Sequence, residues 1–168
     1  RDRVKQILWI DYDNDNDKDL YLTSFNGKNK LFENDGFFYF NDVTISLNLP
    51  DSLSNSFGSS WADINNDGYS EIFVTDMLPE PDERIKTVTT FDNWDRHQYI
   101  KTSGYWNQFT RNTLQLNNGD DTFSEIGRLT GVQATDWSWG ALMFDFQNDG
   151  NKDIFVANGI YQDLTDQD

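Results

Sequence analysis

Short apolar runs recur along this chain, and each one directly follows an acidic segment. The runs cover residues 20–23, 72–75 and 154–157 and read Leu-Tyr-Leu-Thr, Ile-Phe-Val-Thr and Ile-Phe-Val-Ala. They are rich in β-branched and aromatic residues and are apolar at consecutive positions, which is typical of strands buried on both faces. The pattern therefore predicts a β-strand at each of these three places.

A second pattern lies between the acidic segments. Residues 31–43 align without gaps with residues 114–126, and each stretch holds two short apolar segments around Asp35-Gly36 or Asn118-Gly119. Such dipeptides between apolar segments indicate a β-hairpin. Each repeat therefore supplies a strand, an acidic loop, a second strand and a hairpin of two more strands. Four antiparallel strands in this order form a blade of a β-propeller.

The predicted fold class is therefore all-β, a β-propeller fragment of about two and a half four-stranded blades with calcium loops. Blade 1 covers about residues 5–50, blade 2 about 56–130, and a partial blade 3 about 138–168 of the single partial propeller 1–168. An insertion at 76–111 interrupts blade 2 and is predicted to be helical from about Trp94 to Thr102, ending at Gly104. Because two and a half blades cannot close a ring, we expect the chain to be a piece of a larger propeller.

The acidic segments share one spacing of oxygen-bearing side chains. Residues 11–20, 63–72 and 145–154 carry such a side chain at relative positions 1, 3, 5 and 9. This spacing is typical of a calcium loop, in which position 7 adds a backbone carbonyl and Ca²⁺ takes 6–8 oxygens. The predicted ligands are Asp11, Asp13, Asp15, Asp17 (carbonyl) and Asp19; Asp63, Asn65, Asp67, Tyr69 (carbonyl) and Glu71; and Asp145, Gln147, Asp149, Asn151 (carbonyl) and Asp153.

Up to three Ca²⁺ ions are thus expected, and the third site is predicted to be the weakest because Gln147 replaces an acid or Asn. Gly68 and Gly150 allow the sharp bend at position 6, where loop 1 has Asn16, which tolerates the left-handed conformation.

Three alternatives to these calcium sites remain open. The loops could be Asx-rich turns without an ion, they could bind Mg²⁺, or they could be EF-hands. An EF-hand needs Glu at position 12, where this chain has Leu22, Val74 and Val156.

Composition narrows the classes of partner. The chain of 168 residues has 13 Lys and Arg against 29 Asp and Glu, a formal net charge of −16. Such a charge repels phosphates, which argues against nucleic acid and anionic membranes. There is no Cys, which excludes disulfides and Cys-based zinc sites. No apolar run approaches the length of a transmembrane segment. Clustered carboxylates repel one another, so calcium binding should contribute to folding.

The acidic decads, with Phe57-Gly58 before the second of them, resemble the FG-GAP or VCBS repeat family. The hairpin segments at 31–44 look like those of bacterial VCBS proteins related to cartilage acidic protein. The resemblance implies a calcium-binding propeller on the outside of the cell, serving in adhesion or as a scaffold. The chain departs from the pattern at Asn16, at Gln147, and at Lys5-Gln6, which stand where the first repeat would have Phe-Gly.

Aromatic residues form the remaining candidates for binding. The insertion carries Phe91, Trp94, Tyr99, Tyr105, Trp106 and Phe109 together with the only histidine, His97. They could form a recognition surface, but we expect them to pack on the blade. Likewise Trp61, Trp137 and Trp139 are expected between blades. A catalytic role for His97 is not favoured, because nothing in the sequence resembles a nucleophile with a base and an orienting acid.

Three functions remain open at this point. The favoured one is a calcium-binding module of an exported or cell-surface protein, a non-catalytic adhesion, scaffold or accessory subunit that binds a protein or glycan. The second is part of a propeller enzyme acting on polysaccharide, with its catalytic residues outside this segment. The third is a structural module held in a larger, possibly membrane-associated, assembly through its edge strands.

Overall fold

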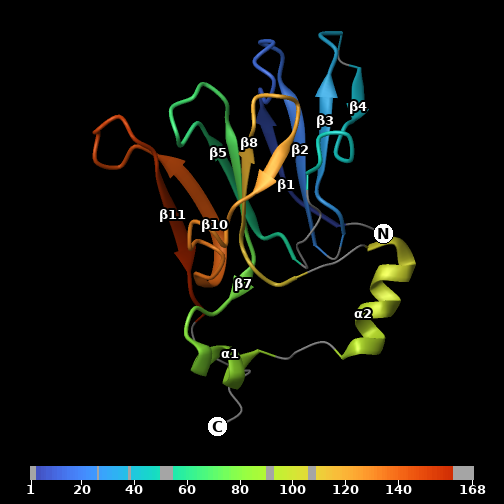
Figure 1. Cartoon of the computed structure of the whole chain (residues 1–168), viewed down its shortest axis with the longest axis vertical. Coiled ribbons are helices and arrows are strands. Elements are labelled where there is room, and N and C mark those ends of the chain that lie inside the picture. The colour runs from blue at the N-terminus through green and yellow to red at the C-terminus, as the bar shows by residue number, and fades with distance from the viewer. Residues whose placement is uncertain are drawn as a thin grey trace.

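Three antiparallel β-sheets stand side by side in this protein (Figure 1). The computed structural model describes residues 3–25, 27–37, 39–49, 55–89, 93–105 and 109–160. The first sheet has the order β1-β2-β3-β4, and the second has the order β5-β6-β8-β9. Each of these two is a simple up-and-down meander, as the repeat pattern predicts for a propeller blade. The all-β propeller-fragment prediction is confirmed.

The first two sheets, blades 1 and 2, follow the predicted strand–loop–strand–hairpin order. The strands of blade 1 are β1 (Arg3–Ile10), β2 (Asp19–Phe25), β3 (Lys30–Asn34) and β4 (Phe40–Asp42). Those of blade 2 are β5 (Gly58–Ala62), β6 (Glu71–Thr75), β8 (Thr113–Asn117) and β9 (Phe123–Glu125). All five residues of β6 are buried, as expected for a strand covered on both faces.

The third sheet, blade 3, contains a strand that the repeat pattern does not predict. Its order is β11-β10-β7, with β10 (Asp136–Phe144) and β11 (Asp153–Asn158) in the expected places. Strand β7 (Met77–Leu78) comes from the start of the insertion and pairs with Asp136 and Trp137 at the beginning of β10. The insertion thus begins by crossing from blade 2 to blade 3, which no local sequence signal reveals because the strand has only two residues.

The apolar core lies between the sheets. One cluster joins blades 1 and 2 and contains Ile10 and Tyr21 of blade 1 together with Ile72 and Val74 of blade 2. The second cluster joins blades 2 and 3 through Phe73, Leu114 and Met143. Each blade therefore depends on its neighbour to cover its apolar face, and each such side chain contributes roughly 1.5–3 kcal/mol when it is fully buried.

The Phe-Gly segment of blade 2 allows close packing against blade 3. A Cβ atom on Gly58 would lie 2.6 Å from the Cα of Gly140 and 2.9 Å from the carbonyl oxygen of Trp139. The ring of Phe57 meets the Trp139 ring edge-on at 5.3 Å and the Phe25 ring at 6.0 Å. The aromatic-Gly pair thus combines an inter-blade aromatic row with a glycine that lets two backbones approach.

Blade 1 uses a different device where it lacks this pair. The side-chain amide of Gln6 donates to the carbonyl of Ser59 at 3.1 Å, and its oxygen accepts from the Ser59 backbone N–H at 2.7 Å. The amide group therefore satisfies both the backbone N–H and the backbone carbonyl of Ser59 in the next blade. Where Lys5-Gln6 stand in place of Phe-Gly, side-chain hydrogen bonds therefore join the two blades instead of a close backbone contact.

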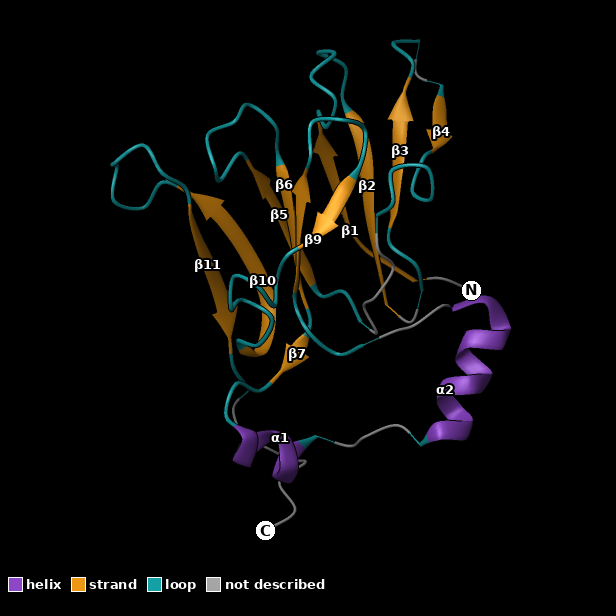
Figure 2. Cartoon of the chain, in the orientation of Figure 1, coloured by secondary structure: helices purple, strands orange, loops and turns teal. Residues whose placement is uncertain are grey.

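The insertion is helical in two places. Helix α1 (Asp82–Val88) was not predicted, while α2 (Trp94–Ile100) continues into a π-helical turn, η1 (Lys101–Tyr105). The predicted helix is thus confirmed in position, but the expected stop at Gly104 is wrong, because η1 runs through that residue. Figure 2 shows both helices at the end of the sheets opposite the acidic loops.

The expectation for the aromatic side chains is only partly met. Trp94 and Tyr99 are each 71% exposed, so the prediction that they pack on the blade is wrong. Trp61 packs against the core between blades 1 and 2, whereas Trp139 contacts Phe57 but remains 49% exposed. Phe91 and Trp106 lie outside the described residues, as does the side chain of Tyr105.

Two alanine substitutions test the backbone contact between blades 2 and 3. Gly58→Ala should destabilise the protein by about 1–3 kcal/mol, because the new methyl group meets fixed backbone atoms. Gly140→Ala is the matched control, since a Cβ there meets nothing within 4 Å. Urea unfolding of both variants gives the comparison; equal stability of the two would contradict the close approach.

Candidate metal centre

The three acidic decads form three equivalent turns at one end of the sheets. They connect β1 to β2, β5 to β6 and β10 to β11, and Figure 1 shows them together at the end away from α1. The residue pairs that close the turns occupy the same register: Ile10 with Asp19, Ala62 with Glu71, and Phe144 with Asp153. Position 9 is therefore always the first residue of the second strand.

The backbone of the turns is the same in each repeat. Position 6 is left-handed, with φ of 73° at Asn16 and 93° at both Gly68 and Gly150. The prediction for Asn16 is confirmed. Position 4 is also left-handed in every loop, at Asn14, Asn66 and Asn148. No role was predicted for these asparagines, although Asn stands at position 4 of all three decads in the sequence.

The carboxylate at position 9 anchors each turn to its strand. It accepts a hydrogen bond from the backbone N–H of position 2 in every repeat: Asp19 from Tyr12 at 3.2 Å, Glu71 from Ile64 at 2.8 Å, and Asp153 from Phe146 at 3.0 Å. One oxygen of this predicted ligand is thus used to hold the loop. The second oxygen of Glu71, Oε1, is buried and has no hydrogen-bond partner among the described residues.

Position 5 has an equally regular role. Its carboxylate accepts the N–H of position 7, from Asp17 to Asp15 at 2.7 Å, from Tyr69 to Asp67 at 2.8 Å, and from Asn151 to Asp149 at 2.9 Å. The three residues predicted to offer carbonyl ligands are therefore held by their N–H groups to a predicted carboxylate ligand. The side chains that could bind a cation therefore also hold the backbone of each turn.

Loop 1 has the arrangement most suited to an ion. Carboxylate oxygens of Asp11, Asp13 and Asp15 all lie within 4.8 Å of one another. Two oxygens bound to one Ca²⁺ at 2.3–2.6 Å lie no more than about 5 Å apart, so this cluster can hold one ion. The Oδ1 atom of Asp11 is buried and has no hydrogen-bond partner in the described part of the chain. A buried acceptor in this state needs a cation or a donor.

Loops 2 and 3 hold position 1 differently. Both oxygens of Asp63 accept backbone N–H groups, from Asp67 at 3.1 Å and from Gly68 at 2.9 Å. Asp145 repeats the arrangement with Asp149 at 3.0 Å and Gly150 at 2.8 Å. In these loops the carboxylate at position 1 organises the turn through its hydrogen bonds. Within the described residues, no hydrogen bond is found for the Gln147 side chain in loop 3. Its role as a ligand therefore stays a prediction.

Burial disfavours the charged form of several of these acids. It raises the pKa of Glu71 to about 7 and that of Asp19 to about 6, and it also raises the pKa of Asp13. The pKa of Asp145 is lowered instead, because the N–H of Gly150 stabilises its charged form. The buried acids of loops 1 and 2 therefore carry an electrostatic cost that a bound cation would remove.

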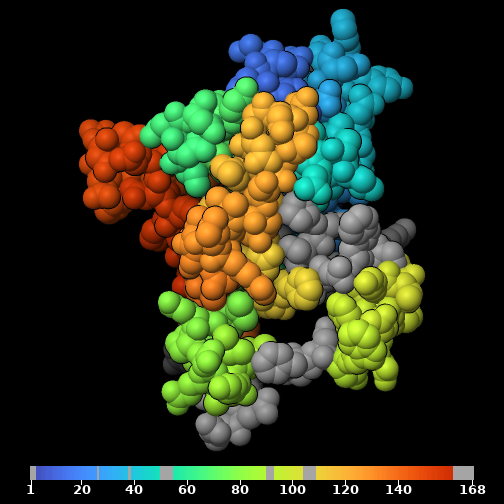
Figure 3. All heavy atoms as spheres, viewed as in Figure 1, coloured from blue at the N-terminus to red at the C-terminus, as the bar shows by residue number. Residues whose placement is uncertain are grey.

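Neighbouring loops are linked through the asparagine at position 4. The Asn14 amide donates to the carbonyl of Gly68 at 2.9 Å, and the Asn66 amide donates to the Oδ1 atom of Asn151 at 3.4 Å. In Figure 3 the blue, green and red loop segments follow one another along the upper left of the molecule. The three turns thus form one continuous acidic ridge across the blades.

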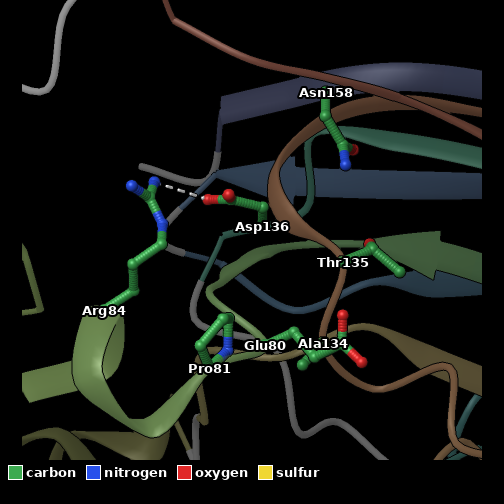
Figure 4. A pocket seen from close by; sticks show the side chains of 7 residues that line it. All are labelled: Glu80, Pro81, Arg84, Ala134, Thr135, Asp136 and Asn158. Carbon is green, nitrogen blue, oxygen red and sulfur yellow. Dashed lines mark hydrogen bonds and ion pairs between the residues drawn. The ribbon is translucent and has the colours of Figure 1, made fainter.

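A pocket with a mixed polar and apolar lining lies beside helix α1 (Figure 4). It encloses about 420 Å³ between the insertion and blade 3, and its lining includes Glu80, Thr135 and Asn158. Arg84 of α1 donates to the Asp136 carboxylate at 2.9 Å across it. This ion pair ties the insertion to the start of β10, so Arg84 and Asp136 have a structural role in the pocket.

The single histidine lies on the exposed helix α2. Its ring is 5.9 Å from that of Trp94 and stacks on Phe109 at 6.4 Å. Among the described residues, neither of these ring partners offers the hydroxyl or carboxylate that acid–base catalysis would need. His97 therefore forms a small aromatic cluster with Trp94 and Phe109, which the sequence did not predict.

The fold and the turns together define a class: repeat proteins with propeller-type blades, whose inner strands are joined by an acidic loop. Comparison with protein families agrees, because the FG-GAP-like repeat matches residues 11–74 and 102–156. The chain belongs to the FG-GAP-like repeat family. No curated protein matches the chain. Within the described residues, no helix is long and apolar enough to cross a membrane.

The raised pKa of Glu71 predicts an unusual pH dependence for the metal-free protein. The folded chain keeps a proton on Glu71 up to about pH 7, whereas the unfolded chain releases it near the ordinary value of 4.5. Glu71 should therefore stabilise the folded chain below about pH 4.5. This contribution to the free energy of unfolding, on the order of 1–3 kcal/mol, should be lost as the pH rises towards 7. Glu71→Gln keeps the acceptor for Ile64 and should remove this loss. Urea unfolding of the parent and of Glu71→Gln, in chelator at about pH 5 and pH 7.5, measures the effect. If the free energy of unfolding changes equally with pH in both proteins, the raised pKa of Glu71 is contradicted.

Proposed function

We propose that this chain is a calcium-stabilised propeller module of an exported or cell-surface protein, which binds a protein or glycan partner without catalysis. The supporting observation is the acidic cluster of loop 1, where Asp11, Asp13 and Asp15 can share one ion and Asp11 has a buried, unpartnered oxygen. The same turn recurs in the next two blades with the same left-handed positions and the same hydrogen bonds from positions 2 and 7.

The donor set favours calcium over other metals. It consists of carboxylate, amide and carbonyl oxygens, without Cys, and the only His lies in the insertion. Oxygen donors suit hard cations, and a flexible turn of many oxygens suits Ca²⁺ better than Mg²⁺, which demands near-ideal octahedral geometry. The ligands would be the side chains at positions 1, 3, 5 and 9 with the carbonyl of position 7 in each loop.

Calcium would act here as a structural ion. When bound, it would supply positive charge beside buried acids such as Glu71 and Asp19, whose charged forms are otherwise disfavoured. In loop 2, Glu71 would give Oε1 to the ion while Oε2 accepts the N–H of Ile64. Metal binding would thereby stabilise the junction between the two inner strands of each blade.

The proposed location follows from the ion. Loops of extracellular modules bind calcium at roughly 10⁻⁴–10⁻³ M, concentrations that occur outside cells. The partner is proposed to be a protein or glycan because the charge of −16 disfavours phosphate-rich ligands. The exposed Trp94 and Tyr99 on α2 offer aromatic surface of the kind that recognises such partners.

Removal of calcium tests the metal assignment directly. Chelation by EGTA should lower the melting temperature by several degrees, since the ion binds only the folded loops; excess calcium should restore it and magnesium should not. Glu83→Ala changes an exposed acid of α1 outside the loops and should respond to EGTA like the parent. An unchanged melting curve in EGTA would exclude structural calcium.

The three sites should differ in strength. Replacement of Asp63 and Asp67 by Ala should mimic chelation, because each carboxylate both organises loop 2 and is a predicted ligand. Gln147→Ala in loop 3 should have a smaller effect, because it removes only a neutral donor. Calorimetric titration with calcium measures the number and affinity of the sites. A larger loss of calcium binding in Gln147→Ala than in the Asp variants would refute this order.

A further inference from the structure

The turn between β3 and β4 of blade 1 carries two strongly exposed aromatic side chains. Phe37 is 87% exposed and Tyr39 is 72% exposed. Figure 1 shows this turn at the same end of the sheets as the acidic loops. Large rings that a protein leaves in water either serve its own turn or serve recognition of a partner. The second blade of the chain distinguishes these two roles.

Blade 2 forms the same turn without aromatic residues. The repeat offset of 83 residues relates Phe37 and Tyr39 to Asp120 and Thr122. In blade 1 the N–H of Asp35 donates to the carbonyl of Tyr39 at 3.1 Å, and the corresponding bond in blade 2 ends on the carbonyl of Thr122 at 3.0 Å. An acid and a threonine therefore support this turn as well as two rings do, so the rings are not needed for folding.

The exposure of this turn does not depend on the position of blade 1 in the chain. Blade 2 packs against blade 1 on one side and against blade 3 on the other. Its corresponding turn nevertheless stays at the surface, where Asp120 is exposed and Thr122 is partly exposed. A further blade that packed on blade 1 in the same way would therefore leave Phe37 exposed.

Negatively charged side chains lie beside the two rings. The Oδ1 atom of Asp35 accepts the N–H of Phe37 at 3.0 Å and that of Tyr39 at 3.2 Å. Asp17 of loop 1 lies against the turn, because a Cβ atom on Gly36 would be 2.7 Å from its Oδ2 atom. Neither of these carboxylates is a predicted calcium ligand, so bound calcium would leave both available to attract a cation.

Other rings of this chain show which group covers an aromatic face here. Three rings lie under a lysine ammonium 5.1–5.6 Å from the ring centre: Lys5 over Phe25, Lys18 over Trp61 and Lys30 over Phe32. This separation is within the range of a cation–π interaction. Within the described residues, no cation lies over the ring of Phe37 or of Tyr39. A partner could supply that cation.

We propose that the β3–β4 turn binds a lysine-rich segment of a partner protein, with ammonium groups over the rings of Phe37 and Tyr39. The carboxylates of Asp35 and Asp17 pair with the same ammonium groups, which combines ring and charge recognition at one turn. The net charge of −16 adds long-range attraction for such a segment. This inference rests on the proposed function, because it names the partner of that binding module.

A variant that carries the turn residues of blade 2 tests the contact. Phe37→Asp with Tyr39→Thr should fold, since blade 2 forms the turn with these residues, and it makes the chain more acidic. Titration calorimetry measures binding of hexa-lysine to the full chain in about 1 mM calcium and about 0.15 M salt. The double variant should bind about tenfold more weakly than the parent, because two ring contacts are lost. Attraction by charge alone would instead make the double variant bind more tightly.

Matched controls separate charge, ring and fold. Leu129→Asp adds the same charge at a side chain that is 86% exposed outside this turn, and it should bind at least as tightly as the parent. Fully acetylated hexa-lysine keeps the length of the probe without its charge and should not bind. Thermal melting reports whether each variant is folded. If the double variant fails to fold, Tyr39→Thr alone should weaken binding about threefold.

The possible outcomes distinguish this contact from the calcium assignment. Equal or tighter binding of hexa-lysine by the folded turn variants would overturn the proposal, as would binding of the acetylated probe. If the turn variants lost binding of cellohexaose but kept that of hexa-lysine, the turn would be a glycan site and the proposal would be wrong. Absence of hexa-lysine binding in a protein whose melting still responds to EGTA would refute the contact alone. Turn-dependent binding in a protein whose melting ignores EGTA would refute only the calcium.

Discussion

The packing of one sheet face against the next is the interaction on which this structure depends. Both apolar clusters lie between blades, so the strands of one blade bury their side chains only when the neighbouring blade is in place. Stability is therefore expected to propagate from blade to blade, as in other repeat proteins.

The acidic loops depend on this packing and reinforce it. Register between the inner strands places position 9 at the start of the second strand, where the N–H of position 2 holds it. At Asp19 and Glu71, burial at this position makes the negative charge costly. Neighbouring loops are then close enough for Asn14 to reach the carbonyl of Gly68. A structural ion at this junction would act on strand pairing within a blade and on contact between blades, which suits a module that presents a rigid surface.

Much of the fold could be predicted from the sequence because its signals are local and repeated. The apolar run at 72–75, the Asn-Gly turn at 118–119 and the acidic decads each specify a strand or turn within a few residues, and their repetition defines the order within a blade. The position 9 acids were predicted as ligands only. Their second role depends on strand register, which brings Tyr12 next to Asp19 and Ile64 next to Glu71 in space.

The sequence by itself determined the four-strand blade, the placement of the acidic loops between strands and the left-handed bend at Asn16, because these follow from backbone preference and short-range spacing. Tertiary structure alone decided how blades meet. The bridge from Gln6 to Ser59, the approach of Gly58 to Gly140 and the pairing of β7 with β10 all involve partners in another blade or in the insertion. Such contacts depend on the relative position of whole sheets, and no local pattern encodes that position.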